Sequence, residues 1–194
     1  MRFIRKMPKV HFCLASEIID PELKYQLNRT ASLAFGHGEE YPNEYVSGAS
    51  LNGGYVAYIL TSDRMKVASV GFGNPTVSTL SNGTTVGESS YWLNSFGTLE
   101  EYRGQGFCTA LVKKFIQKMG SKHILYLTVR TERGNENYGA IKCYTKCGFT
   151  MLPEVYRDHY DGRNTAMVRL PKSRIQRKKP KTKRRKRTKR TNRR

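Results

Sequence analysis

A chain of 194 residues, 38% of them hydrophobic, is long enough for one domain with a sizeable core and short for two. Its formal net charge of +20 is unevenly distributed along the chain. Residues 171–194 contain 15 of the 35 basic residues and none of the 15 acidic residues. The remaining 20 basic and 15 acidic residues give residues 1–170 a net charge of about +5. No apolar run reaches the ~18 residues of a membrane span, and the first residues lack the apolar core of a secretory signal. We therefore expect a globular domain at 1–170 and a disordered basic tail at 171–194, in an intracellular protein of the nucleus or cytoplasm without a membrane partner.

The first half of the chain alternates short apolar runs with polar loops. Residues 9–16 alternate well enough for an opening strand, and Asp20 followed by Pro21 marks the start of an amphipathic helix, because Asp caps helix N-termini and Pro suits their first turn. A loop-like stretch with a short helical turn follows at 36–54. We then expect two strands and a polar, glycine-bearing excursion. These three segments are residues 55–62, 66–74 and 75–90.

The second half predicts strands in alternation with two helices. The first helix follows a glycine-bearing loop, and the second, shorter one is closed by Gly148. The strand between them, residues 123–130, is rich in β-branched and aromatic side chains. The remaining predicted elements are strands at 91–99 and 164–170 and helices within 106–120 and 135–149. This alternation indicates an α/β (α+β) domain with a mixed central sheet of about six to seven strands flanked by helices.

The loop before the first of these helices has the composition of an anion site. Glycine lets the backbone approach a ligand closely, and the free N–H groups of a first helical turn converge where a phosphate is favoured. A Gly-x-Gly loop alone is more often only a tight turn, and this loop matches neither a dinucleotide fingerprint nor a Walker loop. The loop residues are Arg103, Gly104, Gln105, Gly106, Phe107 and Cys108.

A second motif on the next helix completes a known pattern. Its residues are Asn137, Ala140, Tyr144, Lys146, Gly148 and Phe149. Together with the glycine loop, in this order and with a strand between, it resembles the GNAT superfamily of acetyl-CoA-dependent N-acetyltransferases. The resemblance is sharp over residues 90–150 and elsewhere extends only to the order of elements. The chain departs from the family in two places. Cys108 stands where Gly or Ala is usual, and the link between the strand at 123–130 and the next helix is longer than in the family, so either Asn135 or Asn137 takes the expected asparagine position.

The resemblance implies transfer of an acetyl group from acetyl-CoA to a primary amine: a protein N-terminus, a lysine or a polyamine. It implies a pantetheine arm paired with the strand before the loop, pyrophosphate held by loop N–H groups, and Tyr144 as the general acid for the leaving thiolate. The alternative for Tyr144 is an amphipathic residue packed on the sheet. The cofactor contacts implied are Phe96, Thr98, Leu99, Arg103, Gly104, Gln105, Gly106, Phe107, Cys108, Asn137 and Tyr144.

The sequence does not identify a general base. Where some relatives have glutamates, this chain has Trp92 and Thr128, and neither is a base. Glu88, His159 and a water chain held by Asn94 remain as weak candidates. A loop between the first helix and the next strand places Glu39, Glu40 and Glu44 where relatives shape the acceptor pocket; together with Asn94 they form the predicted pocket, although a solvated acidic loop is an equal reading of the three glutamates.

The basic tail has the composition of a segment that binds a polyanion. Attraction to nucleic acid would be independent of sequence and strongly dependent on salt, and the tail has no aromatic residue for base stacking. A solvated run without a partner is the alternative. The densest part comprises Lys178, Lys179, Lys183, Arg184, Arg185, Lys186 and Arg187. Two hypotheses follow: an acetyltransferase delivered by its tail, or a catalytically idle protein of the same fold that acts as a nucleic-acid-binding or structural module.

The four cysteines predict neither a disulfide framework nor a metal site. The chain has no Cys-x-x-Cys pair, so we expect reduced thiols. Cys143 and Cys147 share one helical face at the i, i+4 spacing, but no further Cys or His is expected near them, which favours packing over metal binding. His37 lies between two glycines and is expected to be exposed.

Overall fold

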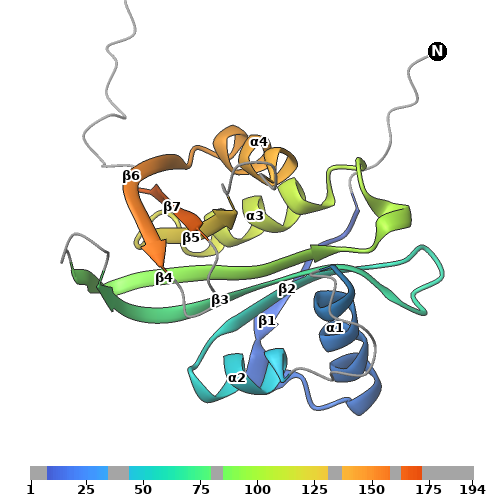
Figure 1. Cartoon of the computed structure of the whole chain (residues 1–194). Coiled ribbons are helices and arrows are strands. Elements are labelled where there is room, and N and C mark those ends of the chain that lie inside the picture. Colours follow the sequence, from blue (N-terminus) through green and yellow to red (C-terminus); the bar gives the residue numbers. More distant parts are fainter. Residues whose placement is uncertain (1–7, 35–43, 80–84, 131–136, 158–162, 172–194) are drawn as a thin grey trace, which may run out of the picture.

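The computed structural model describes residues 8–34, 44–79, 85–130, 137–157 and 163–171. They form a seven-stranded sheet in the order β1-β2-β3-β4-β5-β7-β6. All neighbouring strands are antiparallel except β4 and β5, which run parallel. Helices α1 and α2 cover one face of the sheet and α3 and α4 the other (Figure 1). The predicted mixed sheet flanked by helices is confirmed.

The N-terminal elements begin where the sequence predicts. β1 (His11–Leu14) leads through a 3-10 turn, η1 (Ala15–Glu17), into α1 (Pro21–Ala34). The Asp20 carboxylate accepts a hydrogen bond from the Glu22 N–H (3.0 Å), which satisfies one of the unpaired donors of the first helical turn. The expected helical turn in the next loop is α2 (Tyr45–Leu51), and β2 (Tyr55–Leu60) follows.

The predicted polar excursion at 75–90 is strand over its described residues. β3 (Val67–Thr79) and β4 (Thr85–Thr98) continue through most of it as a long antiparallel hairpin. Thr and Val have high strand propensity, and the Asn82-Gly83 pair at the centre is a common hairpin signal. These two signals outweigh the polar composition on which the prediction rested.

The C-terminal half contains one strand that the sequence did not reveal. α3 (Phe107–Lys118), β5 (Ile124–Arg130), α4 (Tyr138–Lys146) and β7 (Arg163–Arg169) correspond to predicted segments. The short 3-10 turn η2 (Glu100–Tyr102) and the strand β6 (Thr150–Arg157) were not predicted. β6 contains Pro153, which cannot donate to a strand ladder. The sheet accommodates this residue because β6 lies at the edge and its register with β7 shifts between Met151 and Val155.

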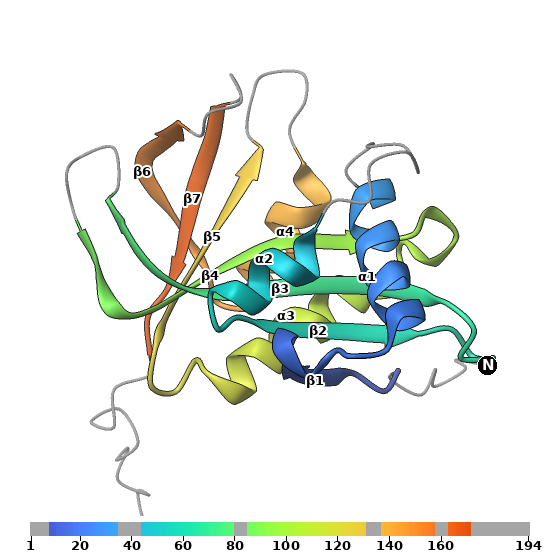
Figure 2. The same ribbon diagram turned by 90° about the horizontal axis from the view of Figure 1, so that it is seen from below.

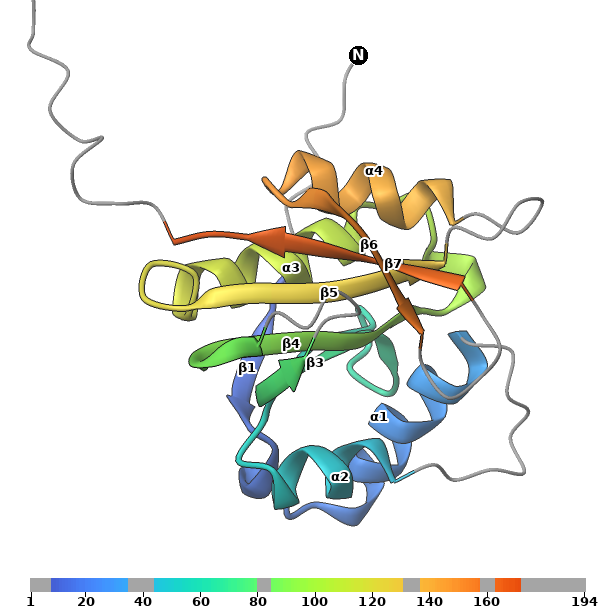
Figure 3. The same ribbon diagram turned by 60° about the vertical axis from the view of Figure 1, so that its left-hand side comes forward.

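The two larger of the three apolar clusters among the described residues lie on opposite faces of the sheet, as the layers in Figure 3 indicate. The core beneath α3 and α4 is built around fully buried Phe115, whose ring meets those of Phe12 and Phe96 edge-on at 5.1 and 5.7 Å. The core beneath α1 and α2 includes fully buried Leu27 and Phe72. Of the described helices, none combines the length and the apolar character needed to cross a membrane.

Candidate active site

A gap opens in the middle of the sheet between its two parallel strands. β4 pairs with β5 from Ser90–Ile124 to Leu93–Leu127. Beyond these pairs β4 continues alongside β3, and β5 continues alongside β7. The two strands therefore diverge after Leu93 and Leu127, as Figure 2 shows. Their facing edges carry backbone N–H and C=O groups that are not paired across the gap, so an extended ligand has partners there.

A β-bulge in β4 lies at the edge of this gap. Val70 pairs with Gly97 and Phe72 with Asn94, so two steps along β3 are matched by three along β4. Ser95 takes the extra position with a positive φ of 50°, a conformation uncommon for residues other than glycine. As a result Phe96 packs in the same core as Leu93, although residues three apart in a regular strand point to opposite faces. The bulge thus directs the Phe96 ring toward α3 and α4.

The glycine loop leads from β4 into α3 with its backbone exposed. Gly104 and Gly106 have φ values of 74° and 83°, and a Cβ added at either would meet nothing within 4 Å. The first intrahelical hydrogen bond of α3 runs from the Ala110 N–H to the Gly106 carbonyl (3.0 Å). The N–H groups of residues 107–109 therefore precede the hydrogen-bond ladder of the helix and are available to a ligand. The open space above the two glycines fits the predicted pyrophosphate of acetyl-CoA.

Tyr144 lies on α4, facing the bulge. Its side chain is 6% exposed, and its ring is 6.3 Å from the Phe96 ring and 6.2 Å from that of Phe149. Burial raises the pKa of the phenol well above its ordinary value, and the neighbouring cysteine sulfurs add to the shift. The side chain is therefore protonated at neutral pH. The fold therefore brings Tyr144 close to Phe96, on the part of β4 that is not paired with β5. This position is compatible with both roles considered for Tyr144, the general acid and the packing residue.

Comparison with known proteins supports the resemblance. The model of the acetyltransferase (GNAT) family matches residues 14–149, more than half of the chain. The chain belongs to the GNAT acetyltransferase family. Among curated protein sequences none matches this chain.

Solved structures of GNAT proteins share the fold at low sequence identity. Escherichia coli ElaA superposes with a TM-score of 0.61 at 16% identity, over 84% of this chain and 99% of its own. An aminoglycoside 6'-acetyltransferase type Ii gives 0.60 at 16% identity, over 86% and 99%. Arabidopsis thaliana NAA60, solved in complex with acetyl-CoA, gives 0.56 at 16% identity, over 82% and 97%. The family membership makes this chain an acetyl-CoA-dependent acyltransferase.

Other predicted cofactor residues of this GNAT domain have structural contacts of their own. The Leu99 N–H donates to the Ala68 carbonyl (3.0 Å), and the Thr98 hydroxyl is 2.8 Å from that of Ser69, so the end of β4 is held to β3. Arg103 and Gln105 are exposed, as a ligand contact requires. Asn137 caps α4 by accepting a hydrogen bond from the Ala140 N–H (3.0 Å). Asn135, the other residue considered for this position, lies outside the described residues.

The face of β4 and β5 opposite α3 and α4 carries aromatic and neutral polar groups next to the gap. Trp92 and Tyr126 are register partners whose rings stack at 6.2 Å with planes 6° apart. Asn94 and Thr128 follow them by two residues on the diverging strands, so the alternation of side chains places them on the same face, and both are half-buried. The sequence did not reveal this aromatic pair, since residues on two separate strands carry no joint signal.

The predicted base and acceptor residues are only partly described. Glu88 lies in β4, six residues before Asn94, which corresponds to about 20 Å of extended strand. Glu44 is exposed just before α2, where its carbonyl accepts the Gly48 N–H (2.6 Å). The rest lie outside the described residues: Glu39, Glu40, His37, His159 and the tail residues Lys178, Lys179, Lys183, Arg184, Arg185, Lys186 and Arg187. Their roles stay predictions.

The expectation that no further cysteine lies near Cys143 and Cys147 is wrong. Cys108, in the first turn of α3, places its sulfur 2.9 Å from that of Cys143. α3 and α4 share one face of the sheet, and this packing brings together thiols that are 35 residues apart in sequence. Among the described residues, no group of three metal-binding side chains has the arrangement to hold a metal ion.

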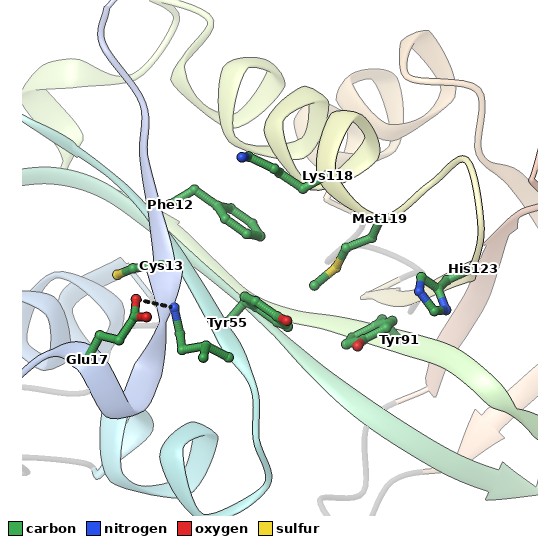
Figure 4. A pocket seen from close by; sticks show the side chains of 9 residues that line it. Phe12, Cys13, Glu17, Tyr55, Tyr91, Lys118, Met119 and His123 are labelled. Carbon is green, nitrogen blue, oxygen red and sulfur yellow. Dashed lines mark hydrogen bonds between the residues drawn. The ribbon is translucent and has the colours of Figure 1, made fainter.

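A cavity of about 370 Å³ lies away from this site, at the other end of α3 (Figure 4). Phe12, Tyr55, Tyr91 and His123 form a row of rings along it, with neighbouring centroids 5.4, 6.1 and 5.0 Å apart. It opens near the C-terminal end of α3, so no free helical N–H groups point into it. The cofactor contacts of the family are therefore better matched by the gap and the glycine loop.

Proposed function

We propose that the protein transfers the acetyl group of acetyl-CoA to a primary amine by direct attack. One observation carries the proposal: β4 has an edge that is not paired with β5 beyond Leu93, and the Tyr144 ring lies 6.3 Å from the ring of Phe96 on this part of β4, while α3 begins with N–H groups outside its hydrogen-bond ladder. They are the three groups that the reaction requires, and they come from three separate segments of the chain. When bound, acetyl-CoA supplies the acetyl group as an activated thioester.

The glycine loop would hold the pyrophosphate without a metal ion. The N–H groups of residues 107–109 and the positive end of the α3 dipole favour an anion there, by ~0.3–1 kcal/mol for the dipole alone at an exposed site. Gly104 and Gly106 keep this surface clear of side chains. A free backbone N–H on β4 near the bulge would donate to the carbonyl oxygen as it gains charge.

Tyr144 would give its proton to the departing thiolate. Its raised pKa keeps the proton on the phenol at neutral pH, but also opposes complete transfer to a solvated thiolate, whose ordinary pKa is about 8.5. The cost of the transfer is smaller than in water because the thiolate forms in the same buried surroundings, which raise the pKa of its conjugate thiol as well. Burial of both partners is therefore part of the proposed role.

The basic tail would bring the enzyme to a polyanion. Its 15 basic residues, with no acidic residue between them, favour nucleic acid or another phosphate polymer as the partner. This part of the proposal is supported by sequence alone.

Calorimetric titration of acetyl-CoA into the full-length chain tests the central proposal. The same titration of residues 1–170, and a matched titration of ATP, control for non-specific binding of phosphates to the tail. We expect one saturable site for acetyl-CoA in both proteins. Release of CoA is then followed in the presence of a panel of amines: peptides with a free N-terminus, N-terminally blocked peptides with one lysine, and polyamines.

Gly106→Asp and Gly106→Asn form a matched pair for this titration. Both residues tolerate positive φ better than most, so both variants are expected to fold. Asp introduces a negative charge beside the predicted pyrophosphate and should weaken acetyl-CoA binding at least ~10-fold more than Asn. Equal binding by the two variants, or no binding by a folded wild-type domain, would move the assignment to the idle, polyanion-binding alternative.

A further inference from the structure

The cysteines of α3 and α4 form a cluster that the acetyl-transfer chemistry does not use. Cys108 and Cys143 are 2.9 Å apart at sulfur, and the Thr109 hydroxyl lies 3.4 Å from the Cys143 sulfur. Cys147, one turn after Cys143, completes the group and is also buried. The fourth cysteine, Cys13, lies in β1 at some distance in the fold from this group.

We propose that Cys108 and Cys143 are a redox-active pair, which hydrogen peroxide converts into a disulfide that thiols reduce again. A disulfide has an S–S length of about 2.05 Å, so closing the 2.9 Å gap requires less than about 1 Å of movement. Since the two residues lie on different helices of the same layer, the bond would join the start of α3 to α4. Cys147, at the C-cap of the helix that carries Cys143, is the alternative partner.

The surroundings favour a thiolate at one position and thiols at the other two. The pKa of Cys143 is lowered, first because the Cys108 thiol donates a hydrogen bond to it, and further through Cys147, Thr109 and the nearby charge of Lys146. The pKa values of Cys108 and Cys147 are raised, because each donates to Cys143 and is removed from water. A thiolate is the form that reacts with peroxide.

The reaction balances in two steps. The Cys143 thiolate attacks one peroxide oxygen and breaks the O–O bond, which gives a sulfenic acid and a hydroxide that is protonated to water. The Cys108 sulfur then attacks the Cys143 sulfur, loses its proton and displaces the hydroxyl group as a second water. Two electrons pass from the two sulfurs to the peroxide, and the partly exposed Cys108 leaves the cluster open to a small oxidant.

The bond would also affect catalysis, a consequence that rests on the proposed function. Cys143 precedes Tyr144 directly, and Cys108 supplies one of the N–H groups that would hold the pyrophosphate. A displacement of the acid by about 1 Å can cost up to ~100-fold in rate. We therefore expect the oxidised enzyme to turn over at least ~10-fold more slowly, with full recovery after dithiothreitol.

Peptide mapping of the full-length chain tests the pair directly. The protein is treated with one to ten equivalents of hydrogen peroxide, its remaining thiols are alkylated, and it is digested with trypsin and analysed by mass spectrometry. Trypsin cleaves after Lys113, Lys142 and Lys146, so Cys108, Cys143 and Cys147 fall on three different peptides. We expect a linked pair of peptides containing Cys108 and Cys143, lost on reduction, while Cys13 stays alkylated. Burial and Glu17 raise the pKa of that thiol to about 11, which makes it a slow-reacting internal reference.

Cys143→Ser and Cys13→Ser are the matched variants, since each removes one of the four thiols. Cys143→Ser should abolish the linked pair, and Cys13→Ser should leave it unchanged. Oxidation of Cys13 ahead of the cluster, or a bond between Cys143 and Cys147 in place of the proposed one, would overturn the proposal. Because the wild-type map does not depend on catalysis, its result separates a failure of the redox pair from a failure of the proposed function. A mapped bond with unchanged turnover would overturn the coupling to Tyr144.

Discussion

Replacing Tyr144 by Phe isolates the hydroxyl that the proposed mechanism requires. The ring packs against those of Phe96 and Phe149 and is 6% exposed, and Phe preserves these contacts without opening a cavity. Ala would instead cost about 3–5 kcal/mol of stability through the cavity, and a loss of activity would then be ambiguous. We expect Tyr144→Phe to fold and to bind acetyl-CoA as the wild type does.

The expected loss lies in kcat. Removal of a positioned general acid typically lowers the rate ~10²–10⁴-fold, which corresponds to about 2.7–5.4 kcal/mol of transition-state stabilisation. CoA release with a saturating amine acceptor, followed with a thiol reagent, measures kcat, and calorimetry measures the affinity for acetyl-CoA. Tyr58→Phe is the matched control, since Tyr58 is buried to a similar degree (8% exposed) in the core on the other face of the sheet.

The general-acid role of Tyr144 is refuted if Tyr144→Phe keeps kcat within about twofold of wild type at equal acetyl-CoA affinity. Tyr144 would then serve only as the packing residue that its sequence position also allows. A loss of the same size in Tyr58→Phe would point to a general effect of a missing buried hydroxyl. The pH profile adds a third readout. Since the pKa of Tyr144 lies well above its ordinary value near 10, its ionisation should not lower kcat of the wild type below about pH 10.

Three further predictions use other features of the molecule. Gly71→Ala places a Cβ 2.5 Å from the Phe96 ring. It should lower the free energy of unfolding, measured in urea, by about 1–3 kcal/mol, and should lower kcat because it displaces the ring beside Tyr144. Gly48→Ala is the control: its Cβ meets nothing within 4 Å, so this variant should be as stable as the wild type or more stable. Truncation after residue 170 should retain kcat and remove salt-dependent binding to duplex DNA in a filter or anisotropy assay, and equal affinity at moderate salt would contradict this role of the tail. The logarithm of kcat/KM should rise with pH at a slope of about one until the acceptor amine is deprotonated, and a plateau unrelated to the acceptor would indicate a base on the enzyme.

The sequence predicted those elements whose signals are local. The Asp20-Pro21 start of α1, the glycine loop before α3 and the Gly148 turn after α4 each depend on the conformational preference of one or two residues, and the structure contains them. The strands with dense β-branched residues were likewise found. β6 was missed because its pattern is interrupted by Pro153, which only its place at the sheet edge makes acceptable.

The features that position the candidate site are not local, and the sequence could not reveal them. The bulge at Ser95 exists only relative to the register of β3, and the gap exists only because β4 and β5 diverge while each stays paired with its outer neighbour. The contact between Cys108 and Cys143 depends on how α3 and α4 pack. Family motifs supplied the candidate residues, while tertiary packing sets the direction of the pKa shifts of Tyr144 and of the clustered cysteines.

The absence of a base at Trp92 and Thr128 limits the acceptors that the proposed reaction can use efficiently. A lysine amine, with a pKa near 10.4, is about 0.1% deprotonated at pH 7.4, which adds about 4 kcal/mol to the barrier if no side chain removes the proton. A protein N-terminus, with a pKa of about 7.7–8.0, loses less than about 1 kcal/mol for the same reason. The stacked Trp92–Tyr126 pair and the half-buried Asn94 and Thr128 have no basic group that would remove this proton. If neither Glu88, His159 nor a water chain at Asn94 removes the proton, the proposed reaction would be most efficient with an amine that is already partly deprotonated in water, such as a protein N-terminus.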